Sequence, residues 1–252
     1  LLILKNHANQ KLLIKAIFFD LDDTLYDRSQ FEINAYKFID QKLCKKYDLK
    51  KGVIYKNLIK IKNLHNYNYR KLFEDTFEKV KVDPKKKNIF ERNCLKYYRE
   101  FVPSKLKLYP NTINVLKKIN KENYFVGIIT NGRVKKQKAK MKILNIEKYF
   151  NLIVYARNFG KKKEKPNPHS FNFVSQKLKI KPDEIIYIGD NPKTDYIGAK
   201  NANVNFLRIK LGEYRKVIIL KKNIKSVKSM KELSKLIWKS YSYIIMLILK
   251  KW

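Results

Sequence analysis

A short apolar segment that runs into carboxylates constrains the fold of this chain more than any other feature. Residues 16–19 read Ala-Ile-Phe-Phe, and Asp20, Asp22 and Asp23 follow at once. A strand buried on both faces of a parallel sheet reads as a continuous apolar run, and ligands bind beyond the carboxyl ends of such strands. Buried carboxylates this close together need a cation, a proton or a ligand. The segment therefore predicts a buried strand with Asp20 and Asp22 at a functional site.

The second half of the chain alternates between helix and strand patterns. The predicted helices are 112–122, 133–145, 168–179 and 194–202, and the strands that follow them are 124–130, 152–155, 185–189 and 204–209. Such alternation with short connections is typical of a doubly wound parallel sheet with helices on both faces. The strand at 16–19 is needed to complete that sheet. We therefore predict an α/β core made of residues 14–27 and 107–238.

The segment 28–106 has no strand pattern. Its apolar residues recur at helical spacing in four stretches, which predicts an α-helical domain inserted into the core. Residues 1–13 are predicted to be an N-terminal extension, and residues 239–252 a C-terminal tail. The apolar run 243–249 in that tail is too short for a bilayer span, which needs ~20 apolar residues. We therefore do not expect a membrane protein.

The net charge of +36 raises the question of nucleic-acid binding. Only eight of the 58 basic residues are arginines, the lysines are spread along the whole chain, and no arginine-rich helix is present. We interpret the charge as compositional and expect no specific nucleic-acid partner. The two cysteines, Cys44 and Cys94, are too few for a disulfide framework, which indicates a cytoplasmic protein. We expect either a monomer or a homodimer.

Further polar groups follow the other predicted strands of the core. Thr130-Asn131-Gly132 offers a hydroxyl, an amide and free backbone N–H groups that suit an anion. Asp190 and Asp195 add two carboxylates, and Lys165 stands before two prolines that stiffen its loop. Because the carboxyl ends of parallel strands share one edge of the sheet, these groups should converge. They predict a site for a divalent cation and a phosphate.

Four motifs thus occur in order and in matching structural places. They are Asp20-x-Asp22-x-Thr24, Thr130-Asn131-Gly132, Lys165-Pro166-x-Pro168 and Gly189-Asp190-x4-Asp195. Together they resemble the four motifs of the haloacid dehalogenase-like hydrolase superfamily, over residues 14–237. The inserted helices resemble the cap of its first subfamily. The stretches around Asp20 and Thr130 are similar to archaeal-type magnesium-dependent phosphatases, including those that act on glyceraldehyde 3-phosphate.

The resemblance implies a Rossmann-like hydrolase core and a phosphatase of a small phosphorylated metabolite, with glyceraldehyde 3-phosphate as one candidate. It implies that Asp20 attacks the phosphorus to form an aspartyl-phosphate. Asp22 is implied to protonate the leaving group and then to activate water. In this family's pattern Mg²⁺ would be held by Asp20, Asp190 and the backbone carbonyl of Asp22, with Asp195 in support. The phosphate-binding residues implied are Thr130, Asn131 and Lys165.

One loop departs from the family pattern. Gly160 is followed by three lysines and Glu164 before Lys165, a longer and more basic loop than is common, so Lys163 or a neighbour stays an alternative phosphate ligand. Halide-removing relatives carry no acid/base aspartate at the position of Asp22, which argues against dehalogenation. A phosphomutase or nucleotidase of the same superfamily, and a basic nucleic-acid-binding or regulatory module, stay as alternatives. The cap is implied to select the ester.

Overall fold

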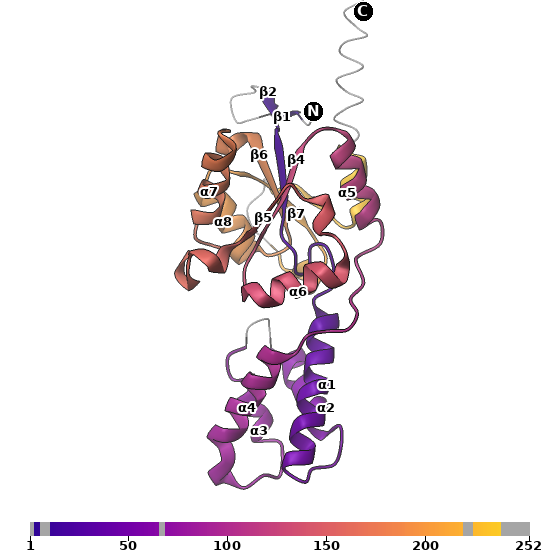
Figure 1. The fold of residues 1–252 in the computed structure, drawn as a ribbon, viewed down its shortest axis with the longest axis vertical. Coiled ribbons are helices and arrows are strands. Elements are labelled where there is room, and N and C mark those ends of the chain that lie inside the picture. Colours follow the sequence, from indigo (N-terminus) through magenta and orange to yellow (C-terminus); the bar gives the residue numbers. More distant parts are fainter. Residues whose placement is uncertain (1–2, 6–10, 66–68, 219–223, 238–252) are drawn as a thin grey trace, which may run out of the picture. The chain divides into compact units, whose positions relative to one another are not determined.

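The computed structural model describes residues 3–5, 11–65, 69–218 and 224–237. The chain divides into two compact units (Figure 1). The core unit comprises Leu1–Asp27 and Lys107–Trp252, and the helical unit comprises Arg28–Leu106. The helical unit is therefore an insertion between the two parts of the core unit.

A six-stranded parallel sheet forms the centre of the core unit. Across the sheet the strands are β5 (Leu152–Tyr155), β4 (Phe125–Thr130), β3 (Ala16–Phe19), β6 (Ile185–Gly189), β7 (Asn205–Ile209) and β8 (Ser226–Val227). The labelled α-helices of the described core are α5 (Thr112–Lys121), α6 (Val134–Leu144), α7 (His169–Leu178) and α8 (Ile197–Asn201), and residues 230–237 are also helical. Figure 1 shows α5 and α7 on opposite sides of the sheet. The predicted doubly wound α/β fold is confirmed.

The central strand β3 is the point at which the topology changes direction. It pairs in parallel with β4 on one side and with β6 on the other, and all four of its residues are buried. The chain runs outward from β3 through β4 to β5 and then returns to the other side of β3 at β6. Crevices at such switch points are where open α/β sheets bind ligands. Asp20 follows β3 at this edge.

Helices α7 and α8 are held against one face of the sheet by apolar packing. Phe171 and Val174 of α7 and Ala199 of α8 share one buried cluster with Phe18 and Tyr187 of the sheet. The Phe171 and Tyr187 rings meet edge to face, with centroids 4.9 Å apart. The burial of these apolar side chains stabilises the position of the strands whose ends carry the polar residues of the site.

The structure differs from the sequence prediction at three places in the core unit. A π-helical turn, Pro192–Tyr196, precedes α8 where one helix over 194–202 was predicted, because the Asn191 side chain accepts from the backbone N–H groups of Lys193 and Thr194. The predicted extension contains two antiparallel strands, β1 (Ile3–Lys5) and β2 (Lys11–Leu13). The two-residue β8 was not predicted. The predicted tail 239–252 lies outside the described residues.

The helical unit has four α-helices in its described part. They are α1 (Ser29–Lys46), α2 (Val53–Leu64), α3 (Leu72–Phe77) and α4 (Lys87–Glu100). Their apolar stripes meet in one cluster of buried residues, which includes Ile39, Leu58, Phe77 and Phe90. Short 3₁₀ turns in the two units are Pro84–Lys86, Glu147–Tyr149, Ala156–Phe159, Lys161–Lys163, Pro182–Glu184 and Glu213–Lys216.

A buried carboxylate joins α1 to the start of α2. Asp40 accepts hydrogen bonds from the backbone N–H groups of Gly52 at 2.8 Å and of Ile54 and Tyr55 at 3.0 Å. Gly52 is the N-cap residue of α2, and the Ile54 and Tyr55 N–H groups belong to its first turn, where they lack partners within the helix and favour a negative charge. Cys44 donates to the same carboxylate at 3.2 Å. Asp40 thus acts as a helix cap supplied by another helix.

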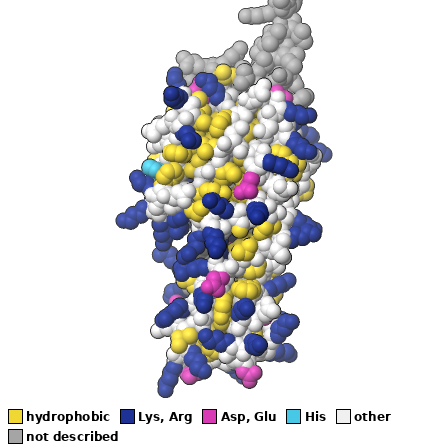
Figure 2. Space-filling model, in the orientation of Figure 1, with side chains coloured by type: hydrophobic (Ala, Val, Ile, Leu, Met, Phe, Trp, Pro, Cys, Tyr) yellow, Lys and Arg dark blue, Asp and Glu magenta, His cyan; other side chains and the backbone are white. Residues whose placement is uncertain are grey.

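Basic side chains are distributed over the surface. Figure 2 shows Lys and Arg side chains scattered over the visible face, with few Asp and Glu side chains between them. None of the helices in the described residues is both long and apolar enough to cross a membrane.

Candidate active site

Asp20 and Lys165 form the centre of the site at the carboxyl end of β3. The Lys165 Nζ lies 2.7 Å from Asp20 Oδ1 and 2.8 Å from Asp195 Oδ1, and both Lys165 and Asp195 are buried. Lys165 also donates to the Ile129 carbonyl at 3.1 Å and contacts the Tyr187 hydroxyl. The ammonium group is therefore fixed by partners from three neighbouring strands or their ends. These contacts hold the Lys165 ammonium group in a defined position beside the Asp20 carboxylate.

The backbone of Lys165 is held by Asn131, the residue that follows β4. Asn131 Nδ2 donates to the Lys165 carbonyl at 2.8 Å, and the Lys165 N–H donates to Asn131 Oδ1 at 2.9 Å. Next to this pair, the Gly132 N–H donates to Glu164 at 2.5 Å, and Arg157 pairs with the other Glu164 oxygen at 2.7 Å. The loop before Lys165 is thereby joined to the end of β4. The side chains of Lys161–Lys163 are exposed.

Asp190 and Asp195 follow β6 and complete an acidic cluster with Asp20. One oxygen of each carboxylate lies within 4.8 Å of the others. Gly189 permits this approach, because a Cβ at that position would lie 2.4 Å from Asp195 Oδ2. Asp195 also accepts from the Asn191 N–H at 3.1 Å. A glycine at the end of β6 is thus needed for the geometry of the cluster.

The charges of this cluster do not balance. Three buried carboxylates face one ammonium group, that of Lys165. Burial, opposed by Lys165, raises the pKa of Asp20 to about 7, and burial together with the Asp195 and Asp20 charges raises the pKa of Asp190 well above its usual range. Burial would lower the pKa of Lys165, but Asp195 and Asp20 outweigh it and raise that pKa. The site therefore fits a hard divalent cation, which prefers carboxylate oxygens.

The Asp22 carboxylate lies in a second group of polar side chains. Lys140 Nζ is 2.6 Å and 2.9 Å from its two oxygens, and Gln137 donates to it at 3.1 Å. The Tyr26 hydroxyl donates to it as well. Gln137 also donates to Thr130 Oγ1 at 2.6 Å, so this side chain connects Thr130 with Asp22. Helix α6 carries Gln137 and Lys140 three residues apart, on one face.

The structure thus brings the predicted residues together in two adjoining groups. Asp20, Lys165, Asp190 and Asp195 form the first, with Asn131 holding the Lys165 backbone. Asp22 and Thr130 belong to the second.

Sequence reasoning missed six contributors, which are Tyr26, Gln137, Lys140, Arg157, Glu164 and Tyr187. The one available signal was the i, i+3 spacing of Gln137 and Lys140 in the first helix after Thr130.

The fold and the site define a class of protein, a doubly wound α/β protein with an acidic, lysine-containing cluster at its topological switch point. Comparison with known families makes this assignment specific. The profile of the haloacid dehalogenase-like hydrolase family matches residues 17–209. The chain belongs to this family.

Named relatives and solved structures agree with the family. The chain is 32% identical over 210 residues to the glyceraldehyde 3-phosphate phosphatase of Methanocaldococcus jannaschii, covering 81% of this chain and 88% of that protein. It is 29% identical over 206 residues to the enzyme of the same name from Methanopyrus kandleri, covering 81% and 87%. A subfamily IA hydrolase structure from Geobacter sulfurreducens shares the fold, with a TM-score of 0.66, 20% identity and coverage of 89% and 96%.

Proposed function

We propose that this chain is a magnesium-dependent phosphatase that hydrolyses a small phosphorylated metabolite. The observation that carries the proposal is the placement of Asp20, 2.7 Å from Lys165 and within a buried cluster of three aspartates at the switch point of the sheet. The names of the two archaeal relatives support a phosphate ester as substrate, and glyceraldehyde 3-phosphate is the first ester to test. The reaction class is phosphoric monoester hydrolysis.

Asp20 is the nucleophile in this proposal. An oxygen of its carboxylate attacks the phosphorus, the bond from phosphorus to the ester oxygen breaks, and an aspartyl-phosphate forms. Asp22 gives a proton to the departing oxygen and then takes a proton from the water that hydrolyses the intermediate. Lys140 and Gln137, which contact the Asp22 carboxylate, hold it in place for its role as base. Asp20 is regenerated and inorganic phosphate leaves.

The remaining site residues bind the phosphoryl group and the metal. Thr130, the Asn131 backbone and Lys165 bind the phosphoryl oxygens, where charge is carried in the transition state. Asp20, Asp190 and the backbone carbonyl of Asp22 would hold Mg²⁺, and Asp195 supports them through its contact with Lys165. When bound, Mg²⁺ supplies the positive charge that offsets the crowded carboxylates and the phosphoryl oxygens. The all-oxygen, buried donor set supports this choice of metal.

The helical unit, residues 28–106, is in this proposal the cap that selects the ester. In the first subfamily of this family, a helical segment inserted at this place serves as a cap. Such caps control access of the substrate to the active site and the choice of substrate. We also propose a cytoplasmic location, in accord with the two free cysteines, Cys44 and Cys94.

The test is a screen of phosphorylated metabolites with the purified full chain, with and without Mg²⁺. We expect Mg²⁺-dependent release of phosphate by the wild type and by the control Asp183→Asn, whose side chain is exposed. Asp20→Asn should release none. Turnover that persists in excess chelator, or in Asp20→Asn, would exclude the proposed mechanism.

A further inference from the structure

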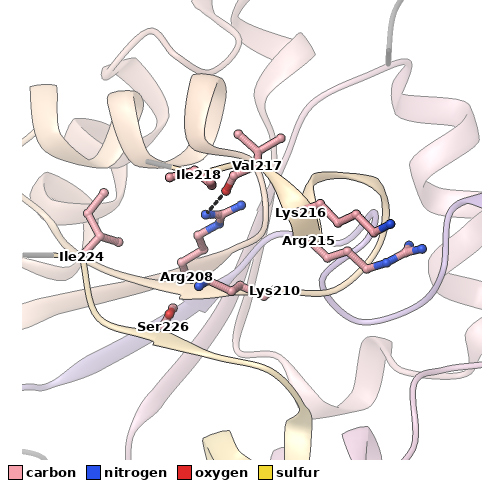
Figure 3. A pocket seen from close by; sticks show the side chains of 8 residues that line it. All are labelled: Arg208, Lys210, Arg215, Lys216, Val217, Ile218, Ile224 and Ser226. Carbon is pink, nitrogen blue, oxygen red and sulfur yellow. Dashed lines mark hydrogen bonds between the residues drawn. The ribbon is translucent and has the colours of Figure 1, made fainter. Parts of the chain in front are cut away.

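A basic pocket lies beside strands β7 and β8 of the core unit (Figure 3). It has a volume of about 180 Å³. The residues that line it are Arg208, Lys210, Arg215, Lys216, Val217, Ile218, Ile224 and Ser226. Four of the eight carry a positive charge and none is acidic. None of them belongs to the candidate active site.

Arg208 is the unusual member of this pocket, because its guanidinium is buried without an ion pair. The residue is only 2% exposed. Its Nη1 donates to the Val217 carbonyl at 2.8 Å and its Nη2 to the Tyr214 carbonyl at 2.6 Å. The Nε is buried and has no hydrogen-bond partner in the described part of the chain. Figure 3 shows the guanidinium between Ile224 on one side and Lys216 on the other.

No carboxylate side chain of this chain balances that charge. All 22 aspartates and glutamates lie in the described ranges, since residues 1–2, 6–10, 66–68, 219–223 and 238–252 contain none. Within those described ranges, no carboxylate forms a salt bridge with Arg208, Lys210, Arg215 or Lys216. Burial lowers the pKa of Arg208, and the charge of Asp190 offsets this only in part. A buried charge without a partner is costly, so an anion from solution should stabilise this one.

The chemistry of the pocket favours one class of anion. Guanidinium groups bind phosphate through paired hydrogen bonds, and lysines bind it as point charges. Four basic residues line the pocket, and this concentration of positive charge favours a dianion over a monoanion. The limited volume favours a small molecule over a nucleic-acid strand.

We propose that the pocket formed by Arg208, Lys210, Arg215 and Lys216 binds a phosphate dianion, free or as the terminal group of a small metabolite. On binding, the Arg208 side chain would shift so that its Nε–H donates to the anion together with the Lys210 ammonium group. The exposed Lys216 side chain would turn toward the same anion. This site is separate from the Asp20 cluster and needs no metal.

The first test follows the arginine Nε–H signals of the full chain by ¹⁵N NMR during titration with orthophosphate, without metal and at constant ionic strength set with chloride. Without metal the excess negative charge of the Asp20 cluster disfavours phosphate there. We expect saturable shifts of the Arg208 signal, assigned by its absence in Arg208→Lys. An Arg208 signal that does not move up to saturating orthophosphate would overturn the proposal.

The second test keeps Arg208 intact, so that a folding defect does not obscure the result. Lys210→Gln/Lys216→Gln should lose at least about tenfold in orthophosphate affinity by calorimetry, because the variant removes two of the positive charges that line the pocket. The control Lys177→Gln/Lys200→Gln removes the same charge from exposed sites and should keep wild-type affinity. Equal losses in the two double variants would show non-specific attraction and refute the site.

The two sources of phosphate are distinguished with Asp20→Asn, which cannot hydrolyse an ester in the proposed mechanism. Glycerol 2-phosphate that shifts the Arg208 signal as orthophosphate does would identify a terminal phosphate group as sufficient. A response to orthophosphate alone would identify the free ion as the ligand. Acetate at equal ionic strength should leave the signal unmoved, and an equal response to acetate would contradict the preference for a dianion.

Discussion

Replacing Lys165 by methionine tests whether this lysine holds the acidic cluster together. Lys165→Met keeps an unbranched side chain in the buried site but removes the ammonium that donates to Asp20, Asp195 and the Ile129 carbonyl. Removing one partner of a buried ion pair leaves the other charge uncompensated, which costs ~3–5 kcal/mol. At about 2–4 °C per kcal/mol for a chain of this size, the Tm should fall by roughly 6–20 °C.

The assay is thermal unfolding followed by circular dichroism in the presence of chelator, with Lys163→Met as the matched control. Lys163 is exposed in the same loop, so its replacement should change stability by no more than ~0.5 kcal/mol. Mg²⁺ should raise the Tm of Lys165→Met more than that of the wild type, because more negative charge is left for the metal to offset. Equal Tm values for the two variants would refute this reasoning about the cluster and return Lys163 to consideration as the phosphate-binding lysine.

Three further results are expected. Asp40→Ala should lower the free energy of unfolding by ~1–2 kcal/mol in urea titrations, because the first turn of α2 loses its cap; unchanged stability would contradict that role. Burial raises the pKa of Cys94, so at pH 8 this thiol should react with an aromatic disulfide reagent only after unfolding, and rapid labelling of the native chain would show that it is accessible. Gly189→Ala should weaken Mg²⁺ binding measured by calorimetry, since the new Cβ would displace Asp195. A variant that keeps wild-type Mg²⁺ affinity would show that the Asp195 carboxylate does not support the metal site.

The sequence predicted the centre of the fold because the signals there are local. The apolar run 16–19 followed by Asp20 is a complete strand-end pattern, and β3 is found at Ala16–Phe19. The alternation after residue 107 likewise placed β4 to β7 to within a residue. Parallel pairing then brings their carboxyl ends to one edge without further information.

The missed features depend on packing between distant segments. Lys140 and Asp22 are 118 positions apart, and the charge of Lys140 does not distinguish it from the many lysines around it. Glu164 looked like an interruption of the basic loop, whereas it bonds to the Gly132 N–H and to Arg157. The strand β8 has two residues, too few to give a periodic pattern.

The composition also could not predict where the basic side chains lie in the folded chain. A count of lysines says nothing about where they converge, and most are scattered over the surface, as Figure 2 shows for one face. That the residues lining the Arg208 pocket include no carboxylate becomes visible only when β7, β8 and the turn Glu213–Lys216 are placed in space.

The most direct test of the central claim is detection of the phosphate on Asp20 itself. The full chain, mixed with Mg²⁺ and a phosphate ester that it hydrolyses, is quenched in acid within one turnover, digested and analysed by mass spectrometry. The proposed mechanism predicts that the peptide containing Asp20 gains the mass of one phosphoryl group. With an aryl phosphate, whose leaving group needs no general acid, the gain should be larger in Asp22→Asn, because loss of the base slows hydrolysis of the intermediate. A phosphoryl group found on any other residue, or none on Asp20 while Asp22→Asn still releases the alcohol in a burst, would contradict it.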